Sequence, residues 1–343
     1  MFSRLNQLTR HLSRPTLNTA FTATATATAI PASVVSPFRN PFPKMTSSAV
    51  QNSRKTIHTA ACLIIGDEVL GGKTIDTNSA FLAKYCFSLG IQLKRVEVIA
   101  DDESEIIEAV RRMSHNYDFV VTSGGIGPTH DDITYESIAK AFNLKLKLHQ
   151  QAFDRMKKLS KPHPMQPQFD WDTPSPNLTA KLRMVEIPHD SSLPEEQQAV
   201  FVAEDMWVPI AIVNGNVHIL PGVPRLFERL LEHLKPSLLP RLTNPEGKGI
   251  YRYLISTPLP ESTVAPYLTD LAARTASRGI KVGSYPRWGK KRNTVTLVGT
   301  DKEFMDSLVA EVEQNVQGKK VAQEDELDPP SDTEEGKPKE YSQ

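Results

Sequence analysis

The feature that most constrains the fold is an alternation between short apolar runs and segments with helical periodicity, which begins near residue 57. Residues 58–66, HTAACLIIG, are an apolar run closed by a glycine, as expected of a buried parallel strand. Residues 77–90, TNSAFLAKYCFSLG, have apolar side chains at helical spacing before a terminal glycine. The pattern continues with expected strands at 91–100 and 117–123 and expected helices at 101–116 and 132–142. This alternation predicts an α/β fold with a mainly parallel sheet.

Composition separates the two ends of the chain from its centre. The chain has 343 residues, enough for two domains, and its 40 Lys and Arg balance its 40 Asp and Glu. This balance gives no net positive field to attract nucleic acid, so none is expected as a partner. Residues 1–66 contain no acid, whereas residues 323–343 carry eight acids and two lysines. The expected division is a disordered segment at 1–54, an α/β domain at 55–245, a small α/β module at 246–318 and a disordered acidic tail at 319–343.

The N-terminal segment has the composition of a mitochondrial transit peptide. It carries Arg4, Arg10 and Arg14 among many hydroxyl residues, and it lacks the apolar run of a secretory signal or a membrane span. Plain disorder is the alternative. Met45 could serve as a second start, so we expect a matrix protein with a possible cytosolic form and no membrane association. Cys62 and Cys86 lie in apolar segments, which predicts buried, reduced thiols.

Polar loops follow the three expected strands of the first domain, at residues 66–78, 100–104 and 123–132. Parallel strands bring their carboxyl ends to one rim, where open α/β sheets bind ligands. For residues 100–104, helix capping is the simpler interpretation of the acids. The polar residues collected at this rim would be Asp67, Glu68, Asp76, Asn78, Asp101, Asp102, Asp131 and Asp132.

The third loop, within VVTSGGIGPTHDD at residues 120–132, has the residues of an anion-binding turn. Its glycines can adopt positive φ and present backbone N–H groups to a ligand, and its hydroxyls add donors near the start of a helix. The expected phosphate-binding residues in this loop are Ser123, Gly124, Gly125, Gly127 and Thr129.

The same loop ends in two acids that would repel a bare phosphate. A divalent cation removes this conflict, because Mg²⁺ is held by one or two carboxylates together with phosphate oxygens. We therefore expect Asp132 and Asp131 as metal ligands, with Asp101 as a further catalytic carboxylate, and Mg²⁺, Mn²⁺ or Co²⁺ as the ion. Asp67 and Glu68 are candidates for orienting water.

These loops match neither a P-loop nor a G-x-G-x-x-G fingerprint. GDEVLGGKTIDTN, the acid pair at 101–102 and SGGIGPTHDDIT instead resemble the signature blocks of the molybdopterin-binding domain family, which includes MogA, MoaB, the CinA proteins and the N-terminal domain of eukaryotic FAD synthase. ILPGVPRLFERLL, residues 219–231, resembles the block that closes this domain in CinA-type members. Residues 260–268 and 279–301 resemble the small α/β module that follows it there.

The resemblance implies a three-layer α/β domain with a mainly parallel sheet, followed by a small α/β module of CinA type. Within the matching blocks, Asn78, Pro221 and Gly222 are expected to contact substrate. Only an acidic tail follows residue 320, so the resemblance implies a stand-alone protein without the PAPS-reductase-like domain of FAD synthase. Because relatives often form dimers or trimers, a homo-oligomer is expected.

The family implies two activities, both on a phosphate linked to adenosine. One is divalent-metal-dependent hydrolysis of a dinucleotide pyrophosphate bond, in FAD or ADP-ribose; the other is molybdopterin binding or adenylyl transfer, with molybdopterin-AMP as the adenylylated species. A non-catalytic ligand-binding protein is the third alternative. The chain lacks the N..G.apG segment that CinA-type members carry before LPGVP, which leaves the substrate open. We expect hydrolysis of FAD to FMN and AMP.

Two further features carry weaker expectations. The insert at residues 160–177 contains Phe169 and Trp171, and it is expected either to cover the pocket or to be disordered. His130 lies in the third loop, residues 123–132, which is the glycine and aspartate loop. A solvent-facing side chain is a simpler interpretation of His130 than a catalytic acid or base.

Overall fold

The computed structural model describes residues 46–161, 165, 168–246, 249–287, 290–324 and 326–327. The predicted transit peptide and the alternative start at Met45 lie outside these residues. Among the helices of the described segments, none has the length and apolar character needed to cross a membrane.

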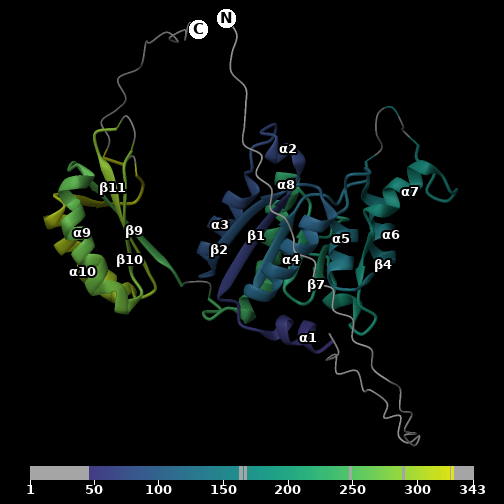
Figure 1. The fold of residues 1–343 in the computed structure, drawn as a ribbon, viewed down its shortest axis with the longest axis horizontal. Coiled ribbons are helices and arrows are strands. Elements are labelled where there is room, and N and C mark those ends of the chain that lie inside the picture. Colours follow the sequence, from purple (N-terminus) through teal and green to yellow (C-terminus); the bar gives the residue numbers. More distant parts are fainter. Residues whose placement is uncertain are drawn as a thin grey trace, which may run out of the picture. The chain divides into compact units, whose positions relative to one another are not determined.

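The large domain is built on a mixed sheet with the strand order β2-β1-β3-β8-β7-β6 (Figure 1). The neighbours β2, β1, β3 and β8 run parallel, whereas β7 and β6 are added antiparallel at one side. The sheet is therefore mainly parallel, as predicted. Its strands are β1 (Thr59–Ile65), β2 (Gln92–Ile99), β3 (Phe119–Ser123), β6 (Ala199–Val200), β7 (Ile210–Val213) and β8 (Val217–Leu220).

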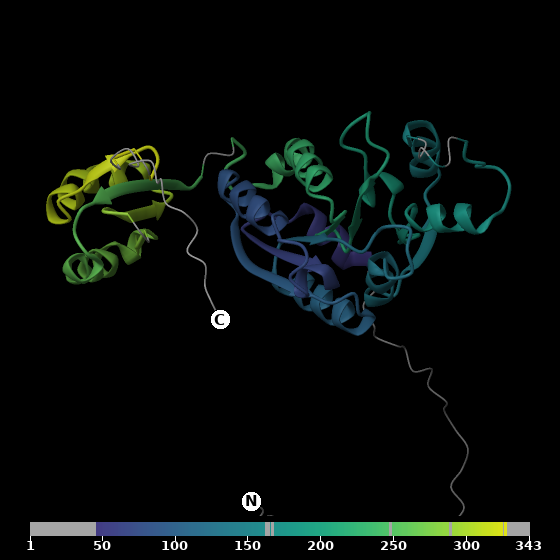
Figure 2. The ribbon, with the colours of Figure 1, turned by 90° about the horizontal axis from the view of Figure 1, so that it is seen from above.

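Helices cover both faces of this sheet, which gives the predicted three layers. The contacting pair α3 and α8 lies on one face and the contacting pair α4 and α5 on the other (Figure 2). Since β1 is covered on both sides, six of its seven residues are buried. The helices of this domain are α1 (Thr46–Arg54), α2 (Asp67–Leu70), α3 (Asn78–Ser88), α4 (Glu103–Asn116), α5 (Thr134–Ala141), α8 (Pro224–Leu238) and the 3₁₀ turn η2 (Leu239–Arg241).

The predicted alternation of strands and helices over residues 58–142 is confirmed, because β1, α3, β2, α4, β3 and α5 occupy the expected segments. Both cysteines are free and fully buried, as expected. Burial raises the pKa of the Cys86 thiol to about 12, so this side chain stays a neutral part of the core at physiological pH.

The expectation that residues 1–54 lie outside the fold is wrong at its C-terminal end. Helix α1 occupies Thr46–Arg54, and its Ala49 is 4% exposed. The Ser48 hydroxyl donates to Asn214 Oδ1 (3.0 Å), and Asn52 Nδ2 donates to the Asn214 carbonyl (3.0 Å). Polar tertiary contacts of this kind hold the helix, and its sequence carries no strong apolar periodicity that would have indicated it.

A satellite layer packs beside the large sheet. It consists of β4 (Lys145–Leu148) and β5 (Glu186–His189), which pair antiparallel, α6 (Gln150–Leu159), α7 (Pro176–Arg183) and the turn η1 (Glu195–Gln197). The insert contributes to this layer, because the Phe169 and Trp171 rings meet edge to face with centroids 4.7 Å apart. Trp171 also packs against the small core formed by Ala152, Met156 and Val185.

The C-terminal module is an antiparallel sheet of order β10-β11-β9-β12 with two long helices. Its core gathers apolar residues from every strand but β12 and from both helices. The predicted boundary at residue 318 is three residues short, since β12 pairs with β9. The elements are β9 (Tyr251–Thr257), α9 (Glu261–Thr275), η3 (Ala276–Arg278), β10 (Lys281–Tyr285), β11 (Asn293–Gly299), α10 (Lys302–Asn315) and β12 (Lys319–Val321).

Candidate active site

The loops that follow β1, β2, β3 and β8 meet at the carboxyl edge of the large sheet. The Asp67 N–H donates to Asp101 Oδ2 (2.9 Å), which joins the loops after β1 and β2. The Gly124 N–H donates to the Leu220 carbonyl (3.2 Å), which joins the loops after β3 and β8. The rim predicted from the sequence is therefore assembled, and a fourth loop, PGVP at residues 221–224, completes it.

Two glycines of the third loop lie where no side chain fits. Gly124 has φ of +111°, and a Cβ there would lie 2.1 Å from the Ile65 carbonyl oxygen. Gly125 has φ of +65°, and its Cβ would lie 2.2 Å from Thr134 Oγ1. A Cβ on Gly222, from the fourth loop, would lie 3.2 Å from Gly124 Cα. Gly124 is thus packed against backbone atoms and Gly125 against the Thr134 side chain, so both positions require glycine.

Fewer backbone N–H groups of the third loop are free to bind an anion than the sequence predicts. The Gly124 N–H is already bonded to the Leu220 carbonyl, so it is not available to a ligand. The sequence could not show this, because the acceptor arrives on β8, about a hundred residues later. Within the described residues, the N–H groups of Gly125 and Gly127 donate to no protein acceptor. These two amides remain as donors for an anion.

Asn78 is hydrogen-bonded to two other residues of the predicted site. Its Nδ2 donates to Ser123 Oγ (2.8 Å) and to the Gly222 carbonyl (2.8 Å), so the buried amide ties α3 to the loops after β3 and β8. Asn78 is 6% exposed, yet its Oδ1 accepts no hydrogen bond from the described residues. A small cavity of about 50 Å³ lies beside Asn78, Ser123, Gly222 and Thr77. An unpaired buried acceptor costs about 1–3 kcal/mol, which a donor group on a ligand would recover.

The Asp101 carboxylate, from the loop after β2, lies beside Gly125 of the glycine loop. A Cβ built on Gly125 would lie 3.4 Å from Asp101 Oδ1. Partial burial raises the pKa of Asp101 above its usual range, and the negative charges of Asp67, Glu68 and Asp131 raise it further, against the lowering effect of the Asp67 N–H bond. A cation beside Asp101 would relieve this desolvation and repulsion. The neighbourhood of Asp101 therefore fits a bound divalent ion.

The neighbouring acid has a structural role instead. Asp102 is the N-cap of α4, where its Oδ1 accepts from the backbone N–H groups of Ser104 (2.8 Å) and Glu105 (3.1 Å). Hydrogen bonding from the Ser104 side chain is the main cause that lowers the Asp102 pKa. The capping interpretation thus holds for Asp102 but not for Asp101.

The two adjacent aspartates of the third loop point to different surroundings. Asp132 Oδ2 accepts from the Thr129 N–H (2.9 Å) and from Thr129 Oγ1 (2.6 Å), so this carboxylate closes the turn that it belongs to. Asp131 has a side chain that is 63% exposed and lies 3.9 Å from His130 Nδ1. His130 is 98% exposed, which agrees with a solvent-facing position.

The acids after β1 contribute differently from one another. Asp67 and Glu68 are the first two residues of the short α2. The Glu68 carboxylate folds back on Gly66, where an added Cβ would lie 2.8 Å from Glu68 Oε2. Asp76 accepts from the Ser79 N–H (3.0 Å) and from the Ser79 hydroxyl, so it stabilises the first turn of α3. Pro221 is buried in the fourth loop beside the exposed Gly222.

Metal binding here would depend on substrate as well as protein. Within the described segments, no three side chains of His, Cys, Asp or Glu gather closely enough to enclose an ion. Mg²⁺ does not need such an enclosure, because it keeps several waters and is held by one or two carboxylates plus phosphate oxygens. In such an arrangement the protein ligands would be Asp132 together with Asp131 or Asp101.

The structure adds one residue that the sequence reasoning missed. Arg183, the last residue of α7, donates from Nη2 to the Asp132 carbonyl (2.9 Å) and lies 3.7 Å from Glu136 Oε1. It falls in the region after the insert, whose place in the fold the sequence left uncertain. No sequence signal distinguished it from the other basic residues there, because its role depends on how α7 packs.

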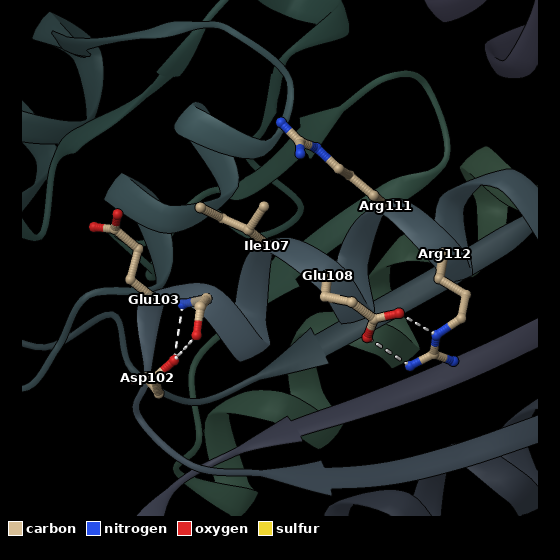
Figure 3. A pocket seen from close by; sticks show the side chains of 7 residues that line it. Asp102, Glu103, Ile107, Glu108, Arg111 and Arg112 are labelled. Atoms are coloured by element: carbon tan, nitrogen blue, oxygen red, sulfur yellow. Dashed lines mark hydrogen bonds and ion pairs between the residues drawn. The ribbon is translucent and has the colours of Figure 1, made fainter. Parts of the chain in front are cut away.

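A broad depression of about 690 Å³ extends from Asp102 along α4 (Figure 3). Its charged side chains are largely paired with one another or with backbone. Arg112 Nε donates to Glu108 Oε1 (2.7 Å), and Arg111 Nε donates to the Ala141 carbonyl (2.6 Å). The depression is an open, self-neutralised surface, in contrast to the unpaired donors and acceptors of the rim.

Known proteins resemble both the large domain and the C-terminal module of this chain. A family model described as "Probable molybdopterin binding domain" matches residues 61–241, and one described as "FAD synthase, middle domain" matches residues 250–325. The chain is 33% identical over 265 residues to a "Probable FAD synthase" of Caenorhabditis elegans, covering 76% of this chain and 50% of that protein. It therefore spans about half the length of the FAD synthase relatives it matches.

Two archaeal proteins are matched over nearly their whole length. A Pyrococcus horikoshii protein is 30% identical over 256 residues, which cover 74% of this chain and 94% of that protein. A solved structure, the CinA protein of Thermoplasma acidophilum, is 31% identical, with 53% of this chain and 98% of that chain covered and a TM-score of 0.43. From the match over residues 61–241, the chain belongs to the family of probable molybdopterin-binding domains.

Proposed function

We propose that this protein is a divalent-metal-dependent hydrolase that splits the pyrophosphate bond of FAD to give FMN and AMP. The substrate class is supported by the match of its C-terminal module to the middle domain of FAD synthase and by its relatives named probable FAD synthase. Both modules of the chain are thus of a kind found in proteins named for FAD chemistry.

One observation carries the proposal. A half-buried carboxylate with a raised pKa, Asp101, lies against a glycine loop whose Gly125 and Gly127 N–H groups donate to no protein acceptor in the described residues. Unpaired amides favour phosphate oxygens, and the acids around Asp101 favour a cation. A pyrophosphate bound with a metal ion offers both partners at once.

The chemistry is a displacement at phosphorus. The oxygen of a water molecule forms a bond to one phosphorus, the bond from that phosphorus to the bridging oxygen breaks, and the leaving phosphate keeps the electron pair. The water proton passes to a rim carboxylate and then to solvent; Asp101, whose raised pKa suits a proton acceptor, and the exposed Asp67 and Glu68 are the candidates. When bound, a divalent ion supplies charge neutralisation of the phosphate oxygens.

The remaining loop residues act by position. The free N–H groups of Gly125 and Gly127 would donate to the non-bridging oxygens, where negative charge builds up as the bond breaks. Asn78 Oδ1, buried and without a donor, would accept from a hydroxyl or N–H group of the substrate. Asp132, with Asp131 or Asp101, would hold the ion against the phosphate.

The test is a chromatographic assay of the purified full chain with FAD, ADP-ribose or NADH. Each substrate is incubated without metal and with Mg²⁺, Mn²⁺ or Co²⁺. We expect FMN and AMP from FAD with at least one of these ions and no product after chelation. Absence of AMP from every substrate under every metal would contradict the hydrolase proposal.

A second candidate is a pterin-binding or adenylyl-transfer role in molybdenum-cofactor synthesis. It is favoured by the description of the family that matches the large domain. Loss of molybdoenzyme activity in a strain that lacks this protein, restored by the full chain, would support it. Normal molybdoenzyme activity in that strain would exclude it.

A further inference from the structure

Arg183 makes the contact between the satellite layer and the glycine and aspartate loop. Its Nη2 donates to the backbone carbonyl of Asp132 at 2.9 Å, and the same atom lies 3.7 Å from Glu136 Oε1 on the first turn of α5. The Arg183 side chain is 28% exposed, so the guanidinium is largely shielded. Hydrogen bonds from a charged donor are about twice as strong as neutral ones, and shielding from water reduces their screening.

The helix that carries Arg183 is held by the aromatic insert. Lys181 Nζ lies 4.9 Å from the Phe169 ring centroid and 5.2 Å from that of Trp171. Leu182 and Met184, the two neighbours of Arg183, pack against the small core of the satellite layer. Packing on both sides fixes the direction in which the guanidinium leaves α7, so little side-chain entropy remains to be lost on contact with the loop.

Asp132 is consequently held from two directions. Thr129 binds its carboxylate Oδ2, and Arg183 binds its carbonyl oxygen. Two residues further on, the Thr134 N–H donates to the Gly125 carbonyl (2.9 Å), so the start and the end of the loop are closed on each other. Moving the Asp132 carbonyl would therefore also move the amides of Gly125 and Gly127 that remain free for a ligand.

Arg183 also opposes the charge of the loop. Its guanidinium contacts a segment that carries Asp131, Asp132 and Glu136. An arginine here reduces the repulsion between the acids before any metal ion binds.

We propose that Arg183 is a positioning residue for the candidate active site, and that it connects the aromatic insert at residues 168–175 to the conformation of the glycine and aspartate loop. It acts through the Asp132 carbonyl and not by contact with the reacting atoms. The proposal rests on the hydrolase function for its kinetic readout only, because the loop conformation can be measured without catalysis.

The experiment compares Arg183→Ala, Arg183→Lys and the control Arg229→Ala in the full chain. Arg229 pairs with Asp205 on the surface of α8 and has no contact with the loop (2.7 Å to Asp205 Oδ2). We expect Arg183→Ala to lower kcat for FAD by at least about tenfold with KM changed less than about threefold, as for loss of positioning. Arg183→Lys keeps the positive charge but loses the planar guanidinium, so its kcat should lie between those of the wild type and Arg183→Ala.

Two readouts distinguish positioning from a general loss of stability. Hydrogen–deuterium exchange of peptides covering residues 124–134 should rise in Arg183→Ala while exchange in β1 and β3 stays unchanged. Millimolar methylguanidinium should restore part of the activity of Arg183→Ala and none of that of an Asp132→Asn variant. Trp171→Leu, which removes one of the two rings beside Lys181, should also raise exchange in residues 124–134.

Unchanged exchange in residues 124–134 of Arg183→Ala would overturn the proposal, whatever the activity. If the wild type releases no AMP, the hydrolase function fails, and the exchange measurement still decides the role of Arg183. If Arg183→Ala does not fold, the same comparison is made with Arg183→Lys. Loss of activity in Arg229→Ala equal to that in Arg183→Ala would show that the kinetic effect is not specific to the loop.

Discussion

The two ends of the large sheet treat their polar groups in opposite ways. At the carboxyl end, Asn78 Oδ1 and the N–H groups of Gly125 and Gly127 have no partner among the described residues. At the amino end, the buried Asn216 accepts from Ser114 Oγ (2.7 Å) and donates to two carbonyls, those of Ser114 (2.8 Å) and Tyr117 (2.9 Å). The polar groups at the first end are left unpaired among the described residues, whereas those at the second end hold the fold together.

The treatment of carboxylates follows the same division. Asp118, just before β3, is partly buried, which raises its pKa. Hydrogen bonds from the Thr59 hydroxyl (2.9 Å) and from the N–H groups of Thr59 (3.0 Å) and His58 (3.1 Å) outweigh this effect, so the pKa is lowered. At the other end, burial and neighbouring acids raise the pKa of Asp101. Substitutions should therefore separate activity from stability according to the end at which they are made.

The largest expected effect is on turnover, from Asp132→Asn. The asparagine oxygen still accepts from Thr129, so the turn persists, but the charge offered to a cation is lost. We expect kcat to fall about 100- to 1000-fold, the size found when one transition-state contact is removed. Steady-state kinetics with FAD and thermal unfolding measure the two properties. Full retention of activity would remove Asp132 from the mechanism.

The next effect is on stability, from Asn216→Ala at the amino end. Asn216 is 2% exposed, and its loss leaves the Ser114 and Tyr117 carbonyls without their donor. We expect the free energy of unfolding to fall by about 3 kcal/mol. Denaturant unfolding measures this, and activity per folded molecule should be unchanged at low temperature. A folded variant with impaired catalysis would break the division between the two ends.

A smaller effect concerns pH and the buried His218 of β8. Burial, assisted by the positive charge of Arg241, lowers the pKa of His218 to about 4 in the folded state. A histidine in the unfolded chain has a pKa of about 6.5. As the pH falls, the unfolded chain therefore binds a proton at this position before the folded chain does. The folded state should lose about 3 kcal/mol of stability from this group between about pH 6.5 and pH 4.

The His218→Gln variant tests this directly. Urea unfolding of wild type and variant at several pH values should give a shallower pH dependence for the variant in the same window, with little difference in slope above about pH 7. Parallel curves throughout the window would show that His218 does not titrate as its burial implies. The amino end of the sheet would then contribute no acid sensitivity through β8.

The smallest effect is a gain in stability from Asp101→Asn. Because the folded pKa of Asp101 is raised, the ionised carboxylate opposes folding at neutral pH, and this cost disappears below its unfolded pKa. Asparagine removes the charge and can still accept from the Asp67 N–H. After solvent screening we expect less than about 1 kcal/mol of stabilisation at pH 7, together with lost turnover. A destabilised variant would show that Asp101 is structural.

The sequence predicts the elements that depend on local periodicity. Strands such as β1 and helices such as α4 follow from apolar spacing, and their alternation places the acids and glycines on one rim. Helix α1 was missed because TSSAVQNSR has no strong amphipathic pattern, and the bonds that hold it come from Asn214, more than 160 residues away. Such long-range polar contacts leave no local signal.

The site shows the same limit. Residue types and resemblance identified Asn78, Ser123 and Gly222, which the structure joins through hydrogen bonds. They did not show that the Gly124 N–H is taken by Leu220, nor that Arg183 reaches the Asp132 carbonyl. Both facts depend on where a distant element packs, so the residues that gather at the rim could be predicted from the sequence and their hydrogen-bond partners could not.

The insertion of β8 between β3 and β7 has a consequence for synthesis of the protein. A nascent chain that has emerged as far as α5 already carries every acid and glycine of the first three loops, yet the Leu220 carbonyl and Gly222, which pack on Gly124, are still to be translated. Closure of the loop thus waits for a contact about a hundred residues away in the chain, which is slow to form. A truncated or stalled chain would therefore carry the acids and glycines of the candidate site without the fourth loop that packs against them.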